Sequence, residues 1–166
     1  MITFIESFKR ELESEAAQTR RMLAIVPADK MDWQPHTKSM KLKPLASHLA
    51  EMPLMIAIVL KHPRWDFINS PYPAADMNTA DELLERLDFA VNEAIKALDE
   101  SSDDILEEPW SLGAGDVTYL ALPKWEAVRH AFGQNAHHRA QLQVCMRLLD
   151  IPVPGPYGPS ADEMGG

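Results

Sequence analysis

Residues 123–149 read PKWEAVRHAFGQNAHHRAQLQVCMRLL, and this stretch decides the fold. It is long enough for about seven helical turns. Pro123 suits the first helical position, because the N–H group that proline lacks would have no helical partner there. One stripe along the expected helix carries nitrogen and oxygen groups where a bundle core needs apolar side chains. The residues of this polar stripe are His130, Gln134, His137, His138 and Gln141.

The histidines of the polar stripe have two interpretations. Imidazoles four residues apart on a helix commonly bind one metal ion together, but a third ligand must then come from elsewhere. A pair of neighbouring histidines on a helix is also often simply in contact with solvent. Spacing alone leaves both interpretations open.

Three earlier segments have the apolar period of amphipathic helices. They are residues 2–26, 43–60 and 79–100. Pro27 ends the first helix, and Pro53 should kink the second. The third has the clearest start, because Thr79 and Glu82 have the spacing of a capping box. Between the second and third lies a proline-rich, aromatic segment, residues 62–78, which we expect to be a long surface connection at the mouth of a cleft.

Four such helices predict an all-α fold, a four-helix bundle forming a single domain over residues 1–166. Residues 101–122, with Gly113 and Gly115, predict a short irregular or hairpin-like excursion before the last helix. Residues 150–166 are rich in proline and glycine and predict an extended C-terminal tail that wraps back over the bundle. Because the connections are not all short, up-down-down-up order is as plausible as simple up-and-down order.

Composition excludes several classes of function. The net charge of −9 argues against nucleic-acid binding, which needs a basic surface. We expect no membrane span, since no long apolar run stands out. Cys145 is the only cysteine, which rules out an internal disulfide and fits a cytoplasmic location. Its helical phase favours a buried packing role over a catalytic thiol.

Three further residues are candidates for a site. His48 falls on the apolar stripe of the second helix, where an unpaired imidazole would be costly. It is therefore either a core histidine bonded to a neighbour or a metal ligand that faces the stripe of the last helix. Glu51, one turn later, either faces solvent or supports the site as a base or hydrogen-bond acceptor. Arg139 either holds an anionic substrate or forms a surface ion pair.

Three sequence segments together resemble the DinB-like family, whose wider superfamily includes thiol-dependent transferases. They are WQPHTKSMKLKPLASHLAEMP at 33–53, PKWEAVRHAFGQNAHHRAQL at 123–142 and IPVPGPYGPSADE at 151–163. The resemblance implies a four-helix bundle that holds a divalent metal, nickel or zinc, through three histidines. One family histidine, in the second helix, matches His48. The other two, in the last helix, match positions 134 and 138.

Position 134 departs from the family pattern, because it is Gln134 while position 138 is His138. A glutamine amide oxygen is a weaker ligand than imidazole for borderline metals. Three outcomes remain open. Gln134 ligates through its oxygen, His130 or His137 takes its place, or the site holds no metal and the histidines form a hydrogen-bonded cluster.

The resemblance implies a metal-dependent enzyme, a hydrolase or a low-molecular-weight thiol transferase, acting on a small molecule. The metal would lie between the second and last helices. The alternative is a non-enzymatic metal-binding protein, or a dimeric stress or interaction protein, with a degenerate metal site. A homodimer is expected by analogy with the family and not from any pattern in the sequence.

Overall fold

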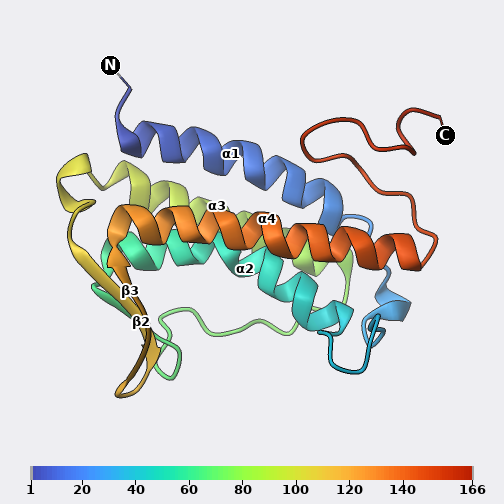
Figure 1. Ribbon diagram of the computed structural model, residues 1–166, viewed down its shortest axis with the longest axis horizontal. Coiled ribbons are helices and arrows are strands. Elements are labelled where there is room, and N and C mark those ends of the chain that lie inside the picture. Colours follow the sequence, from blue (N-terminus) through green and yellow to red (C-terminus); the bar gives the residue numbers. More distant parts are fainter. Residues whose placement is uncertain (1, 166) are drawn as a thin grey trace.

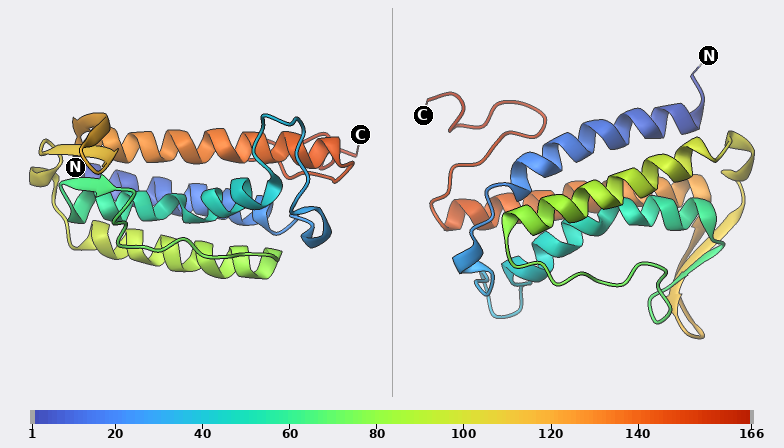
Figure 2. Two further views of the ribbon diagram at one scale, coloured as in Figure 1. Left: turned by 90° about the horizontal axis from the view of Figure 1, so that it is seen from below. Right: turned by 180° about the vertical axis from the view of Figure 1, so that it is seen from behind.

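The computed structural model describes residues 2–165, which form four long helices. They are α1 (Phe4–Leu23), α2 (Leu42–Lys61), α3 (Ala80–Asp99) and α4 (Lys124–Leu148). The predicted helices are confirmed, with ends shifted by less than one turn. In Figure 1, α1 and α4 run one way and α2 and α3 run the other, so the order is up-down-down-up. The link from α2 to α3 must therefore return along the length of the bundle, as Figure 2 shows.

Two of the helices begin at capping boxes. The Thr79 hydroxyl accepts a hydrogen bond from the Glu82 N–H, and the Glu82 carboxylate accepts one from the Thr79 N–H, as predicted. Thr3 and Glu6 make the same pair of bonds at the start of α1. Each box satisfies N–H groups that the first helical turn leaves unpaired. The capping box of α1 could also have been predicted from the sequence, because Thr3 and Glu6 have the same spacing of three residues.

The prediction of an all-α fold was wrong, because the described residues also form a three-stranded mixed sheet. Its strands are β1 (Arg64–Asp66), β2 (Pro109–Ala114) and β3 (Val117–Pro123). The hairpin-like excursion is the antiparallel pair β2–β3, which turns at Gly115 with a φ of 54°. The short strand β1 comes from the connector after α2 and pairs with β2 in parallel. The local sequence of a three-residue strand does not predict its pairing with a strand so far away in the chain.

Arg64 of β1 holds the hairpin in place. Its guanidinium donates hydrogen bonds to the carbonyl oxygens of Gly115 and Val117, at 2.8 and 3.0 Å, and to the Thr118 hydroxyl at 2.9 Å. These bonds satisfy carbonyls at the turn, where the ladder of the hairpin ends. They also fix the connector that follows β1, which forms one wall of the candidate site.

Helix α2 lies in the centre of the bundle, packed mainly against α3 and α4. Its length and hydropathy meet the criteria for a membrane span, contrary to the sequence expectation, yet 72% of its apolar window is buried inside the protein. Core packing therefore accounts for its apolar character. Pro53 lies inside it, and α2 bends along its length in Figure 1. A bend is expected there, because proline cannot donate the hydrogen bond to the carbonyl four residues earlier.

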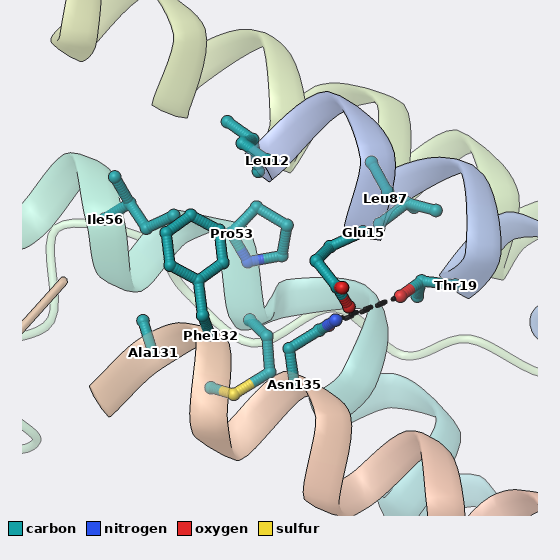
Figure 3. Close-up of a pocket in the computed structure, with 11 residues that line it drawn as sticks. Leu12, Glu15, Thr19, Pro53, Ile56, Leu87, Ala131, Phe132 and Asn135 are labelled. Atoms are coloured by element: carbon teal, nitrogen blue, oxygen red, sulfur yellow. Dashed lines mark hydrogen bonds between the residues drawn. The ribbon is translucent and has the colours of Figure 1, made fainter. Parts of the chain in front are cut away.

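Figure 3 shows a small pocket near Pro53, which residues of all four helices line. Thr19 and Asn135 are both buried beside it and hydrogen-bond to each other, with the Asn135 amide nitrogen donating to the Thr19 hydroxyl at 3.2 Å. The cavity volume is about 10 Å³. A space of this size is comparable with one water molecule. It is therefore part of the core and is too small for a substrate.

The predicted return of the tail over the bundle is confirmed. The Arg21 guanidinium of α1 donates to the Gly155 carbonyl at 3.2 Å and pairs with the Glu163 carboxylate. Arg147 of α4 pairs with Asp162 at 2.6 Å. The tail thus joins α1 to the C-terminal half of α4, on the right-hand side of Figure 1.

Candidate metal and substrate site

The imidazole rings of α2 and α4 meet at one place. The ring centroids of His48 and His138 are 4.6 Å apart, with the rings edge to face. His137 lies next to them, with its ring centroid 5.0 Å from that of His138. The packing of α2 on α4 brings together two side chains that are 90 positions apart in the sequence (138 − 48).

Gln141 orients the His138 ring. Its amide oxygen lies 3.0 Å from His138 Nδ1. This contact holds the Nδ1 edge of the ring toward Gln141 and leaves the Nε2 edge free for another partner. Histidine ligands of metals commonly have this arrangement, with the second nitrogen donating to an oxygen. Sequence reasoning placed Gln141 on the polar stripe but gave it no role, although its spacing of three residues from His138 was a usable signal.

Burial keeps His48 neutral. The pKa of His48 lies below the usual value of 6.5, first because burial disfavours the charged ring and second because His138 is close. Glu51 opposes the shift but does not reverse it. A neutral imidazole retains the lone pair that metal coordination needs, so His48 is suited to coordination at neutral pH.

The sequence suggested that the polar stripe takes the place of apolar core residues on α4. The structure shows that it does not. Its residues are half-buried or exposed, and the core of α4 is formed by an adjacent face. That core face includes Val128, Ala131, Phe132, Asn135, Arg139, Leu142 and Met146. Gln134 and His130 precede His138 by one and two turns and are half-buried. The stripe therefore lies along the edge of the α2–α4 contact, where a ligand has access from solvent.

The donor set at the two rings is limited. Within residues 2–165, no three His, Cys, Asp or Glu side chains gather closely enough to hold a metal ion. The structure brings together His48 and His138, and it leaves His137 exposed beside them. Gln134 makes no hydrogen bond to any described side chain, so its amide is not committed elsewhere. Two imidazoles with a neutral amide one turn away are the donors that the helices offer.

Glu51 does not face solvent freely. Its Oε1 accepts hydrogen bonds from the Arg86 guanidinium, at 2.9 Å from Nε, and from the Ala75 N–H at 3.2 Å. The side chains of Arg86 and Glu51 are 16% and 22% exposed. This pair ties α2 to α3 and to the connector, and it fixes the carboxylate one turn from His48.

A pocket of about 210 Å³ opens beside His48 and Glu51. One side is helix α2, with Met52, Leu54 and Ile58. The other side is formed by Trp65 of β1 and by Phe67, Ser70 and Tyr72 of the connector that follows it. The proline-rich aromatic segment expected at a cleft mouth therefore lines this pocket. Its size suits a small ligand better than a polymer.

Arg139 does not contribute to this site, and the expected surface ion pair was wrong. Its side chain is 2% exposed and lies on the core face of α4. The guanidinium pairs with Glu15 of α1 at 2.7 Å and donates to the Tyr157 hydroxyl of the tail at 2.6 Å. Cys145 is also buried, and burial raises the pKa of its thiol, which fits the packing role over the catalytic one.

The comparisons with known proteins identify the family of this chain. Residues 1–165 match the model of the DinB family. The chain belongs to the DinB family. The resemblance carried by the three sequence segments is thereby confirmed. A search of curated proteins gave no match.

Three solved structures share the fold. A DinB-like protein from Bacillus subtilis has a TM-score of 0.72 at 14% identity, with 90% of this chain and 97% of that chain covered. One from Bacillus cereus ATCC 10987 has a TM-score of 0.70 at 21% identity, covering 93% and 99%. A DinB family member from Exiguobacterium sibiricum 255-15 has a TM-score of 0.66 at 17% identity, covering 93% and 97%. At these identities the similarity establishes the fold alone.

Proposed function

We propose that this DinB family protein is a metal-dependent enzyme acting on a small molecule in the cytoplasm. His48 and His138 would hold a divalent ion, nickel or zinc, with Gln134 as a weak third ligand. The observation that carries the proposal is the meeting of two imidazoles from separate helices, 4.6 Å between centroids, beside a small pocket. The contact between His138 Nδ1 and Gln141 leaves Nε2 as the coordinating atom in this proposal.

The donor set fits a loosely held borderline ion. Imidazole nitrogen suits zinc and nickel, and a neutral amide oxygen adds less affinity than a third imidazole would. Such an ion, when bound by His48, His138 and Gln134, would supply Lewis acidity that favours the anionic form of a water or thiol beside it.

The protein side chains around the rings have distinct roles in this proposal. Glu51 is held rigidly by Arg86, and its second carboxylate oxygen is the acceptor for the proton of a nucleophile, water for a hydrolase or a low-molecular-weight thiol for a transferase. Trp65, Phe67 and Tyr72 exclude water from the substrate and orient it. Arg139 lies on another face of α4 and acts only through the fold.

The direct test is metal titration of the full chain, purified without a histidine tag and stripped with chelator. Replacing Gln134→His restores the family pattern and should raise zinc or nickel affinity about tenfold or more, because imidazole is the stronger ligand. His48→Ala and His138→Ala should each abolish tight binding. His36→Ala is the matched control, since His36 is exposed in a loop and should leave the affinity unchanged. Equal and negligible binding by the wild type and Gln134→His would overturn the proposal.

A second candidate is a non-enzymatic metal-binding or dimeric stress protein with a degenerate site. Gln134 favours it, because a weak third ligand is what a disused site would carry. Exposed apolar side chains near the β2–β3 turn offer a surface for a homodimer, namely Phe67, Ile68, Val117 and Tyr119. Metal binding without turnover in a screen of electrophiles and small thiols, together with a dimer in light-scattering measurements, would favour this candidate.

A further inference from the structure

The pocket beside His48 has an apolar body and one polar end. Its apolar lining comes from α2 and from two aromatic rings, Trp65 of β1 and Phe67 just after it, whose centroids are 5.0 Å apart. At about 210 Å³ it is somewhat larger than a cavity of roughly 150 Å³ known to accept benzene. The apolar body therefore fits one aromatic ring or an aliphatic group of similar size.

The hydrogen-bond donors that line the pocket are already engaged within the protein. Trp65 Nε1–H donates to the Ser70 hydroxyl at 3.4 Å, and the Ser70 hydroxyl donates to the Tyr72 carbonyl at 3.0 Å. The Tyr72 hydroxyl donates to Glu93 at 2.9 Å. Burial and Glu93 raise the pKa of Tyr72 to about 12, so this proton stays in place. Apart from His48, the lining offers a ligand no free side-chain donor among the described residues.

An acceptor remains at the polar end. Glu51 Oε1 receives the bonds from Arg86 and Ala75, while its Oε2 has no hydrogen-bond partner among residues 2–165. The Arg86 guanidinium is not free to bind a ligand, because it pairs with Glu51 and also donates to the Pro73 carbonyl at 2.8 Å. No lysine or arginine belongs to the described lining of the pocket. A carboxylate ligand would therefore find no free cation in the described lining, because Arg86 is already paired with Glu51.

We propose that the pocket selects small apolar molecules that carry an amine or hydroxyl group, with this group donating to Glu51 Oε2 and the apolar body lying against Trp65 and Phe67. This inference rests on the proposed function in one respect, that the pocket is the substrate site of the enzyme. The selectivity itself comes from Glu51 and the engaged donors, and it does not require a metal.

The test uses three probes of nearly equal shape, namely benzylamine, benzyl alcohol and benzoate. Binding to the chelator-stripped full chain is measured by ligand-observed NMR, because a metal ion would attract benzoate for a separate reason. We expect dissociation constants on the order of millimolar for the amine and the alcohol, as for other fragments of this size. Benzoate should bind at least about tenfold more weakly, because no cation of the described lining is free to pair with its charge.

Two matched variants test the assigned acceptor. Glu51→Gln removes the charge and supplies an amide N–H, so the amine-to-benzoate affinity ratio should fall about tenfold or more. Glu93→Gln removes a charge from nearby on α3, outside the pocket lining, and keeps an acceptor for Tyr72, so the ratio should stay within about twofold of the wild type. Amine binding should also change the tryptophan fluorescence of the wild type, because Trp65 lines the pocket. Loss of this change in Trp65→Phe would locate the probe there.

Two outcomes would overturn the inference. One is benzoate binding as tightly as benzylamine to the wild type, and the other is an unchanged ratio in Glu51→Gln. The result is separable from metal binding. Selectivity in a protein that never binds metal would leave this inference standing and remove the proposed enzyme, whereas metal binding without selectivity would do the reverse.

Discussion

Helix α4 carries polar side chains on two faces, the buried core face with Arg139 and the accessible polar stripe with His138 and Gln134. The two faces differ in whether these side chains have protein partners. On the core face, Arg139 is 2% exposed and pairs with Glu15, while its guanidinium also binds the Tyr157 hydroxyl. On the neighbouring face, His138 is half-buried and Gln134 lacks a protein partner among the described residues. Satisfied buried charges hold a fold together, and uncommitted ligand atoms at an accessible edge are available for chemistry. Adjacent residues of one helix thus differ: Arg139 stabilises the fold, while His138 is accessible for the proposed function.

The largest expected effect comes from breaking the satisfied face. Arg139→Ala should lower the free energy of unfolding by about 3–5 kcal/mol, because it leaves the largely buried Glu15 carboxylate without its cation. Urea denaturation monitored by circular dichroism measures this loss. His138→Ala is the matched control on the other face and should change stability by less than about 1 kcal/mol.

The same comparison has a sharper form. Replacing both partners by apolar residues of similar size, Arg139→Met with Glu15→Leu, should recover much of the lost stability, since no charge is then left unpaired. A double variant as unstable as Arg139→Ala would show that packing, and not the unpaired carboxylate, accounts for the loss.

The next effect concerns the link from this face to the tail. Tyr157 donates to Glu15 and accepts from Arg139 through a single hydroxyl, at 2.9 and 2.6 Å. Tyr157→Phe keeps the ring over the Arg139 guanidinium and removes only these bonds, so it should cost roughly 1 kcal/mol. Chemical denaturation gives the cost, and limited proteolysis should show faster cleavage within residues 151–163. Unchanged stability together with unchanged cleavage would contradict the assigned role of the hydroxyl.

The sequence predicted the helices because the apolar period is a local property, and Thr79 and Glu82 marked a helix start directly. The helical phase of His48 left two alternatives, a core histidine or a ligand facing the last helix, and the family resemblance favoured the second. The separation of the two faces of α4 was available and missed. Arg139 is four residues after Asn135 and three before Leu142, in phase with the core, whereas His138 is one position, about 100°, away.

The strand β1 and the Glu51–Arg86 pair could not be predicted in this way. Three residues, Arg64–Asp66, carry no recognisable period, and their partner strand is more than forty positions later in the chain (109 − 66 = 43). Glu51 looks like a solvent-facing residue in its own helix, and only the arrival of Arg86 from α3 gives it a fixed position. Pairings between distant segments are set by tertiary packing and not by local pattern.

The smallest expected effect is a dependence on acid pH that belongs to the tail. Arg147 holds the pKa of Asp162 below its ordinary value of 3.8, and the Ser160 N–H does the same for Glu163, whose ordinary value is 4.5. Because these folded-state pKa values are lowered, the groups add stability at neutral pH. That stability is lost as pH falls below the unfolded values and through the folded ones.

His48 acts in a different range, which allows the two contributions to be separated. Its lowered pKa means that the unfolded state binds its proton first, so stability begins to fall below about pH 6.5. Asp162→Asn should leave the loss of stability caused by His48 unchanged. It should reduce only the further loss of stability below about pH 4. Thermal unfolding of the wild type and Asp162→Asn from pH 7 to pH 3 measures both ranges. Because Asp162 binds the tail to α4 at an exposed surface, the two curves should differ modestly at pH 7 and converge as the wild-type carboxylate is protonated.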